Sequence, residues 1–244
     1  MRFYPSCIIA LSALFAAACA STPPAANPKP SEAPNTPMAK TNGSQVSVSD
    51  LDRRLAQYAP VELAVDLQTL EPQEREVASL VIEASRKIHE IFLRQAWAGN
   101  PRLAQELAKG TGPEAETART FFKLNAGPWD RLDENHPFLG EKPHPAGAGY
   151  YPEDLTAQEF EAWIASHPED REAFTSFVTV IERSSDRLRA VPYSQKYAEW
   201  LKPAADLLRR AAERTKNASL AHFLRLRADA FLDDQYTASD FAWM

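Results

Sequence analysis

The sequence predicts a mainly α-helical domain with few or no strands. Of its 244 residues, 44% are hydrophobic and 25% are charged, which is ordinary for a globular chain long enough to bury a core. In several stretches the apolar residues recur at steps of three and four, the spacing of a helix with one buried face. Only residues 174–181 (FTSFVTVI) are rich enough in aromatic and β-branched side chains to predict a strand, and a helical continuation is the alternative there.

The first residues have the composition of a secretory leader. Arg2 supplies positive charge, residues 7–15 are apolar, and three alanines precede Cys19. The apolar run is shorter than the roughly 20 residues that a membrane-spanning helix needs. We therefore expect residues 1–18 to be a cleaved signal peptide and Cys19 to carry lipid, with ordinary cleavage after Ala18 or Ala20 as the alternative.

Residues 19–46 follow as a segment rich in Pro, Ala, Asn and Ser with almost no large apolar side chains. Such a composition cannot bury enough surface to offset the entropy of ordering, so we expect a disordered tether between the membrane and a helical domain of residues 47–244. Because Ala20 follows Cys19, the anchor resembles those of outer-membrane lipoproteins that face the periplasm. The membrane is thus the first expected partner.

The first expected helix begins near Leu70, with Pro72 in its first turn, where proline is tolerated. A short helix over residues 101–109 should end at Gly110, a natural left-handed stop. A third, over residues 113–124, turns Phe121 and Phe122 inward. Apolar residues that mark the buried face of the first helix are Val77, Leu80, Val81, Ala84, Ile88, Ile91 and Phe92.

Residues 125–152 form a long segment in which prolines and glycines punctuate aromatic side chains. Loops of this length inside a compact domain are uncommon and are often functional. Polar groups among aromatic ones can offer a peptide both hydrogen bonds and an apolar wall. The candidate cleft residues are Asn125, Trp129, Asp130, Arg131, Tyr150 and Tyr151. In the alternative interpretation, the aromatic residues pin the loop to the core, and Asp130 and Arg131 cap neighbouring helices.

Three helices are expected after this loop. Thr156 and Glu159 form a capping box that begins a helix reaching about His167. Residues 194–215 and 219–233 carry continuous apolar stripes, and Pro203 should kink the first of these two helices.

The net charge of −6 argues against nucleic acid as a partner, because phosphate backbones need a concentrated basic surface. A zinc peptidase needs two histidines closely spaced on one helix, and none of the five histidines has such a neighbour. His89-Glu90 opens like a metallopeptidase motif, but neither Leu93 nor Arg94 is the second histidine. We therefore predict no catalytic residue, no metal ligand and no cofactor in this chain.

Four segments resemble the bacterial dipeptidyl-peptidase III family: FFKLNAGPWDRLD (121–133), AGAGYYPEDLT (146–156), VPYSQKY (191–197) and SLAHFLRLRADAFLDDQY (219–236). The resemblance covers about residues 70–244. It implies the helical N-terminal lobe of a two-lobed zinc metallopeptidase that removes dipeptides from peptide N-termini. The family's zinc helix, of the His-Glu-x-x-Gly-His type, is expected beyond the matched stretch.

The leading hypothesis is therefore an envelope lipoprotein equivalent to that lobe, inactive alone, with a separately encoded zinc-binding half as a possible partner and peptides as ligands. The rival hypothesis is a non-catalytic peptide-binding or scaffold lipoprotein that has kept the lobe without its chemistry. A non-functional remnant is the third.

Overall fold

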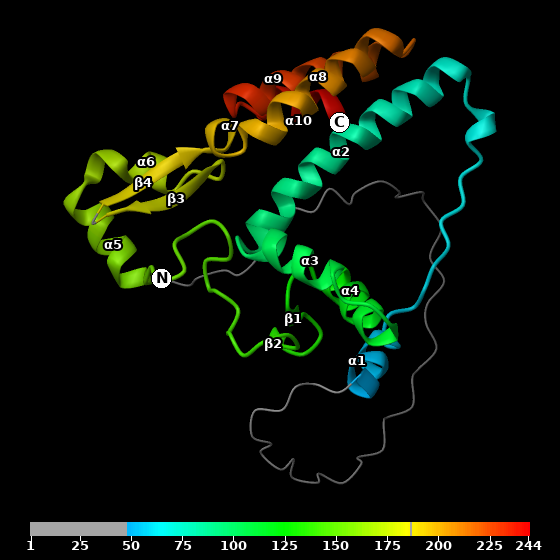
Figure 1. Cartoon of the computed structure of the whole chain (residues 1–244). Coiled ribbons are helices and arrows are strands. Elements are labelled where there is room, and N and C mark those ends of the chain that lie inside the picture. Colours follow the sequence, from blue (N-terminus) through cyan, green and yellow to red (C-terminus); the bar gives the residue numbers. More distant parts are fainter. Residues whose placement is uncertain (1–47, 186) are drawn as a thin grey trace, which may run out of the picture. The chain divides into compact units, whose positions relative to one another are not determined.

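Helices dominate the computed structural model, which describes residues 48–185 and 187–244 (Figure 1). The predicted leader, Cys19, the whole of the predicted tether and its boundary with the domain lie outside the described residues. The helices are α1 (Val48–Leu55), α2 (Pro72–Ala96), α3 (Asn100–Ala108), α4 (Pro113–Asn125), α5 (Ala157–Ser166), α6 (Arg171–Phe174), α7 (Tyr193–Lys196), α8 (Ala198–Arg214), α9 (Ala218–Asp233) and α10 (Thr237–Trp243). One-turn 3-10 helices lie at Leu67–Thr69 and Pro168–Asp170.

The strands described form two separate antiparallel pairs. β1 (Trp129–Asp130) pairs with β2 (His136–Pro137) inside the long loop, and β3 (Thr179–Ser184) pairs with β4 (Arg187–Pro192). In the second pair Ile181 lies opposite Ala190. The predicted fold class, mainly α with few strands, is confirmed.

The largest core lies where α2, α8 and α9 pack side by side, as Figure 1 shows. Leu80 and Ala84 of α2 are buried there, as the spacing predicted. Many of the contacting residues on α8 and α9 are alanines, which let helices approach closely. The alanines of this core are Ala84, Ala204, Ala205, Ala211, Ala212, Ala221 and Ala228.

Three smaller clusters complete the described core, and one of them joins α2 to β3 and α8. Under α1, the buried rings of Phe121 and Phe122 on α4 pack with Leu51 and with Phe138 of the long loop. Beside β3, Ile164 of α5 packs in a separate cluster, whose other buried members are Phe174, Ile181 and Leu188. The inward position predicted for the two phenylalanines of α4 is thus confirmed.

The capping signals placed helix starts well. Pro72 is the first residue of α2, and the Oγ1 atom of Thr156 accepts a hydrogen bond of 3.1 Å from the backbone N–H of Glu159 at the start of α5. The Glu159 carboxylate also pairs with Arg183, whose Nη1 and Nη2 atoms lie 2.7 and 3.0 Å from its oxygens. The capping box therefore also ties α5 to β3.

Three predictions about boundaries were wrong. The strand predicted at 174–181 begins only at Thr179, because Phe174 ends α6 and a turn follows in which Ser176 Oγ accepts from the backbone N–H of Val178. The helix predicted over 194–215 is divided into α7 and α8 at Tyr197, whose ring is 2% exposed in the core next to α2. α8 then runs through Pro203.

The third error concerns Gly110. It has no positive φ, and α3 ends on Lys109 in a right-handed conformation. The left-handed glycine is Gly112, with φ 90°, which precedes Pro113 at the start of α4. Helices α1 and α10 were not predicted, since each is too short for a recurrent apolar pattern to stand out.

Candidate functional site

The long loop that carries most candidate residues is held by two anchors. Its first part folds as the β1–β2 pair, and Phe138 N–H donates to the carbonyl of Pro128 at 2.9 Å. Its second part docks on the end of α2, where Gly149 N–H donates to the carbonyl of Gln95 at 2.8 Å. The Tyr150 carbonyl then accepts from Ile181 N–H of β3 at 2.8 Å. The loop is therefore an ordered part of the core.

The six candidate cleft residues differ sharply in exposure. Asn125, Trp129 and Asp130 are 6%, 3% and 2% exposed. Tyr150 is half-buried, Arg131 is exposed, and Tyr151 is 39% exposed. Only the exposed members of this set can meet a ligand without movement of the loop.

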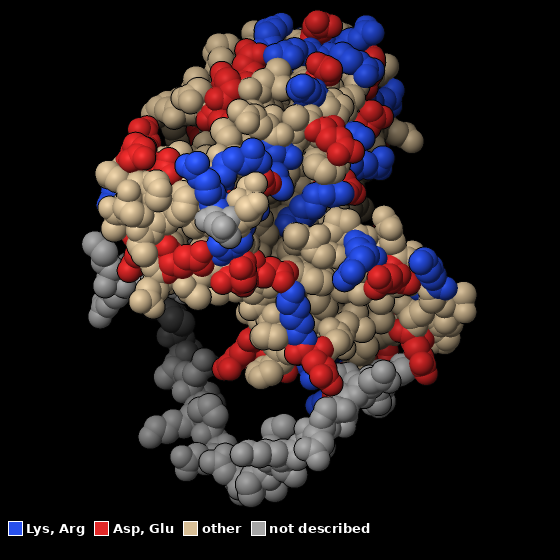
Figure 2. Space-filling model, turned by 60° about the vertical axis from the view of Figure 1, so that its left-hand side comes forward, with Lys and Arg blue, Asp and Glu red and all other residues tan. Residues whose placement is uncertain are grey.

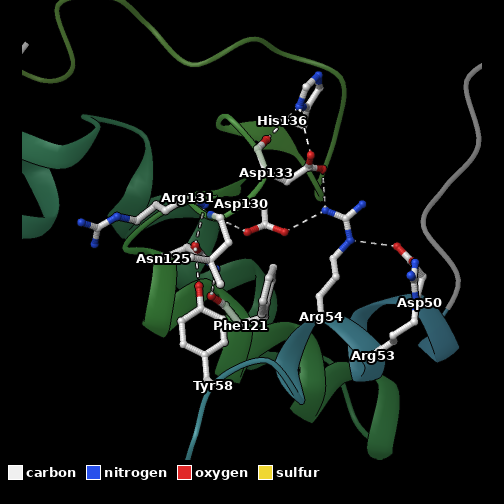
Figure 3. A network of polar contacts seen from close by, with 11 residues as sticks. Asp50, Arg53, Arg54, Tyr58, Phe121, Asn125, Asp130, Arg131, Asp133 and His136 are labelled. Carbon is white, nitrogen blue, oxygen red and sulfur yellow. Dashed lines mark hydrogen bonds and ion pairs between the residues drawn. The ribbon is translucent and has the colours of Figure 1, made fainter. Parts of the chain in front are cut away.

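A network of polar contacts surrounds the buried carboxylate of Asp130 (Figure 3). Arg54 of α1 points into it, and its Nη1 atom lies 2.8 Å from Asp130 Oδ2 and 3.0 Å from Asp133 Oδ2. The Nε atom of the same side chain lies 2.9 Å from Asp50. The second oxygen of Asp130 accepts from the backbone N–H of Leu132 at 3.0 Å. One arginine therefore fastens the first helix to the loop.

The pKa values within this network follow from the same contacts. Burial lowers the pKa of Arg54, but hydrogen bonds to Asp130 and Asp50 outweigh burial and raise it above the ordinary arginine value. Hydrogen bonds from Arg53 and Arg54 hold the pKa of Asp50 below its usual range. Arg54 is thus a permanent positive charge beside the buried carboxylate of Asp130.

Asn125 orients the turn that follows α4. Its Oδ1 atom accepts from Arg131 N–H at 2.9 Å and from the Tyr58 hydroxyl at 3.4 Å, as Figure 3 shows. Its Nδ2 atom donates to the carbonyl of Phe121 at 2.9 Å. Both polar atoms of the Asn125 amide therefore form hydrogen bonds within the protein. The Arg131 side chain points away from this amide (Figure 3).

Trp129 belongs to a second group, formed with α2 and the loop. Its ring packs edge-on against Trp97, with centroids 5.1 Å apart, and against His144 at 4.8 Å. Its Nε1 atom donates to the carbonyl of Lys142 at 2.7 Å. Trp97 in turn donates to Glu153 at 2.7 Å, and Lys142 pairs with the same carboxylate. Trp129 therefore pins the loop, as the alternative interpretation expected.

The two tyrosines lie in different surroundings. Tyr151 packs edge-on against Phe160 of α5, with centroids 5.7 Å apart. Burial raises the pKa of both Tyr150 and Tyr151. Burial raises the pKa of Tyr193 and Tyr197 above the ordinary tyrosine value, and Tyr150 raises both further.

The structure thus brings Asn125, Asp130 and the backbone of Arg131 together and leaves Trp129 and the tyrosines in other groups. Sequence reasoning missed Arg54, Tyr58 and Asp133, which complete the network. The signal available for Arg54 was its spacing of four residues from Asp50, which makes an intrahelical pair. Nothing in the sequence pointed to the contact with Asp130, 76 residues away.

The histidines lie on separate elements. His89 on α2 and His222 on α9 are exposed, and His167 caps α5 with its ring stacked on Trp163 at 4.1 Å. His136 Nδ1 lies 2.8 Å from the carbonyl of Asp133, and burial lowers the pKa of His144. Within residues 48–185 and 187–244, no three His, Cys, Asp or Glu side chains gather closely enough to hold a metal. These donors do not fit the zinc that the resemblance implies.

Charged side chains of both signs are interspersed on the face shown in Figure 2. Many charged side chains of the described residues are paired, for example Arg209 with Asp229 at 2.7 Å between α8 and α9. In the part of the chain that the structure describes, no helix is both long enough and apolar enough to cross a membrane.

Two solved structures are similar to this chain. The structure of dipeptidyl-peptidase III from Caldithrix abyssi superposes with a TM-score of 0.76 at 42% identity, over 79% of this chain and 37% of that chain. The dipeptidyl-peptidase III structure from Corallococcus sp. strain EGB gives a TM-score of 0.77 at 41% identity, over 80% of this chain and 37% of that chain. This chain is related to part of dipeptidyl-peptidase III.

Two further results limit what that relation means. No family model matches the chain. Nudix hydrolase 3 of Arabidopsis thaliana is 28% identical over 246 residues, which is 80% of this chain and 32% of the plant protein. The chain spans about a third of the length of each of these relatives. These names belong to much longer proteins, and the activities of those proteins are only proposals for this chain.

Proposed function

We propose that this chain supplies the helical N-terminal lobe of a dipeptidyl-peptidase III-like zinc hydrolase and does not hydrolyse peptides alone. The observation that carries the proposal is 42% identity along 79% of the chain, together with a TM-score of 0.76. At that identity the similarity is one of sequence as well as of fold. The complete enzyme, by its family name, releases dipeptides from peptides.

The inactivity of the chain by itself follows from the chemistry of the reaction. Hydrolysis by a zinc peptidase needs a bound cation that polarises the peptide carbonyl and lowers the pKa of water. The five histidines of the sequence include no pair spaced three or four residues apart on one helix. The zinc would come with the part of dipeptidyl-peptidase III that this chain does not match, which would carry the His-Glu helix.

Purified residues 46–244 should bind no stoichiometric zinc and release no dipeptide from a dipeptidyl-naphthylamide. Metal analysis after dialysis and a fluorescence assay of the released naphthylamine measure the two quantities. The matched positive control is the complete dipeptidyl-peptidase III of Caldithrix abyssi under the same conditions. Turnover by residues 46–244 that a chelator abolishes would contradict the proposal.

A peptide-binding lipoprotein without chemistry is the second candidate. It is favoured by Arg131 and Tyr151, which lie in the same loop and expose their side chains to solvent. Coexpression of the unmatched part of the Caldithrix abyssi enzyme distinguishes the two functions. Recovery of dipeptide release supports the lobe, and a tightly bound peptide without recovery supports the binding protein.

We also propose that the chain is held at the outer membrane through lipid on Cys19, with the domain facing the periplasm. The support is the order of Arg2, an apolar stretch and three alanines before that cysteine. Labelled palmitate should enter the full-length chain in a Gram-negative host and should not enter the Cys19→Ser variant. Equal labelling of the two chains, or none in either, would contradict lipidation at Cys19.

A further inference from the structure

The segment between α1 and α2 exposes a row of large apolar side chains. Val61, Leu63, Val65 and Leu67 are 74%, 89%, 75% and 51% exposed. The segment has neither helix nor strand before the 3-10 turn at Leu67, and Asp66 has extended backbone dihedrals. Single exposed apolar residues are ordinary, but four in a row at every second position are not.

The residues between them differ in kind. Glu62, Ala64 and Asp66 alternate with the apolar row, so an extended chain has one apolar face and one acidic face. This is the pattern of a strand in an antiparallel sheet that covers a core on one side and meets solvent on the other. Pro60 stands just before it, a position that strands tolerate.

The backbone of the segment is also unpaired. Among the described residues, no hydrogen bond involves an N–H or C=O group of residues 61–65. The first backbone bonds appear at Asp66, whose carbonyl accepts from Thr69 N–H at 3.3 Å. An added strand supplies both missing features at once, because a sheet edge pairs the backbone while the sheet's core covers the apolar face.

A second copy of this segment cannot offer its acidic face a basic partner, because residues 61–67 contain no lysine or arginine. In an antiparallel self-pair centred on Ala64, Glu62 of one chain lies opposite Asp66 of the other, and a parallel pair sets each acid against itself. Like charges directly opposite each other destabilise a sheet. The acidic face instead fits a neighbouring strand that carries lysine or arginine.

The apolar row continues into a hollow on α2. The hollow has a volume of about 250 Å³, and Leu67 and Ile82 line it, with Arg75 and Arg86 among its charged residues. Ile82 is 52% exposed. A sheet that accepts the segment can therefore extend its apolar side chains against α2.

We infer that residues 61–66 form an edge strand on an antiparallel sheet of the part of the enzyme that this chain does not match, with basic side chains beside Glu62 and Asp66. The inference rests on the proposed function, because the occupant is the part of dipeptidyl-peptidase III that this chain does not match. The matched part is 37% of the Caldithrix abyssi chain, so most of that protein is available to supply the sheet.

The test is to coexpress the full chain with the unmatched part of the Caldithrix abyssi enzyme and to purify through a tag on the latter. Residue-resolved hydrogen exchange then reports on the segment. An edge strand donates only every second amide to its neighbour. We expect slowed exchange at either residues 61, 63 and 65 or residues 62, 64 and 66 in the complex, and fast exchange at all of them in the chain alone.

Substitutions test the apolar and the acidic faces separately. Leu63→Asp should weaken the complex by roughly tenfold to 100-fold, since it removes a buried leucine. Leu132→Asp is the matched control, because Leu132 is 59% exposed in the long loop and should leave affinity unchanged. Glu62→Lys should weaken the complex more at low than at high ionic strength.

The outcomes separate the two proposals. Failure of the two polypeptides to associate would overturn the proposed lobe, and with it this inference. A complex in which the amides of residues 61–65 exchange freely and Leu63→Asp has no effect would overturn the inference alone. Protection of these amides in the chain by itself, at a mass of two copies, would also overturn it, because the occupant would then be a second copy.

Discussion

Replacement of Arg54 by alanine is expected to lower the free energy of unfolding by about 3–5 kcal/mol, the usual cost of removing one partner from a buried ion pair. Asp130 is 2% exposed, and Arg54 Nη1 lies 2.8 Å from its carboxylate. Without the arginine, the buried carboxylate loses the cation that offsets its desolvation. Small domains are stable by only about 5–15 kcal/mol, so the loss is large. Urea unfolding followed by far-UV circular dichroism measures it.

Arg53 provides the matched control for this prediction. It lies next to Arg54 on α1 and also pairs with Asp50, but its side chain is 76% exposed. Arg53→Ala should change stability by less than about 1 kcal/mol, as surface ion pairs do. If Arg54→Ala costs no more than Arg53→Ala, the buried pair does not hold α1 to the loop.

A double variant tests the cause. Asp130→Asn keeps an oxygen that can accept from Leu132 N–H and removes the charge. Combined with Arg54→Met, it should recover much of the stability that Arg54→Met loses alone, because no unpaired charge stays buried. Strictly additive losses in the double variant would show that desolvated charge is not the reason.

Gly149→Ala is expected to lower the free energy of unfolding by about 1–3 kcal/mol, the range for overpacking a well-packed core. A Cβ atom at this position would lie 1.9 Å from the backbone oxygen of Arg94 in the last turn of α2. Backbone cannot rotate away as a side chain can, so the loop must lift from the helix. The hydrogen bond from Gly149 to Gln95 would lengthen with it. Thermal unfolding and proteolysis of the loop measure the effect.

The neighbouring residue supplies the control. Ala148 has φ 48°, a left-handed conformation that glycine adopts without strain. Ala148→Gly should therefore stay within about 1 kcal/mol of the parent, since relief of strain and added chain entropy oppose each other. A loss in Gly149→Ala no greater than in Ala148→Gly would mean that the close approach to Arg94 does not limit the loop.

The helical part of the fold was largely predictable because its signals are local. Steps of three and four, Pro72 at a helix start and the Thr156 cap act within one or two turns, and they placed α2, α4, α5 and α9 well. The errors arose where a contact with a distant segment determines the boundary of a helix or strand. Tyr197 interrupts the run into α7 and α8 because its ring is buried beside α2, which no local pattern records.

The candidate site was predictable only as a segment. The Pro/Gly/aromatic composition of residues 125–152 predicted a long loop, and the structure shows that this loop is anchored on α2 and β3. The composition could not tell which polar groups face solvent, because Asp130 and Arg131 are adjacent and yet Asp130 is buried while Arg131 is exposed. Whether Arg131 and Tyr151 contact a peptide stays a prediction.

By itself the sequence determined the helical class, the principal helices, the acidic charge and the resemblance to dipeptidyl-peptidase III, since these depend on composition and on patterns a few residues long. The tertiary structure decided that Arg54 pairs with Asp130, which lies 76 residues away in the chain, and that Gly149 packs against the backbone of α2. It also decided that the apolar side chains of residues 61–67 are exposed to solvent. Each of these features depends on burial and on contacts between segments that are distant in sequence. Such contacts become strong only when folding removes the contacting groups from water, so no local pattern in the sequence predicts them.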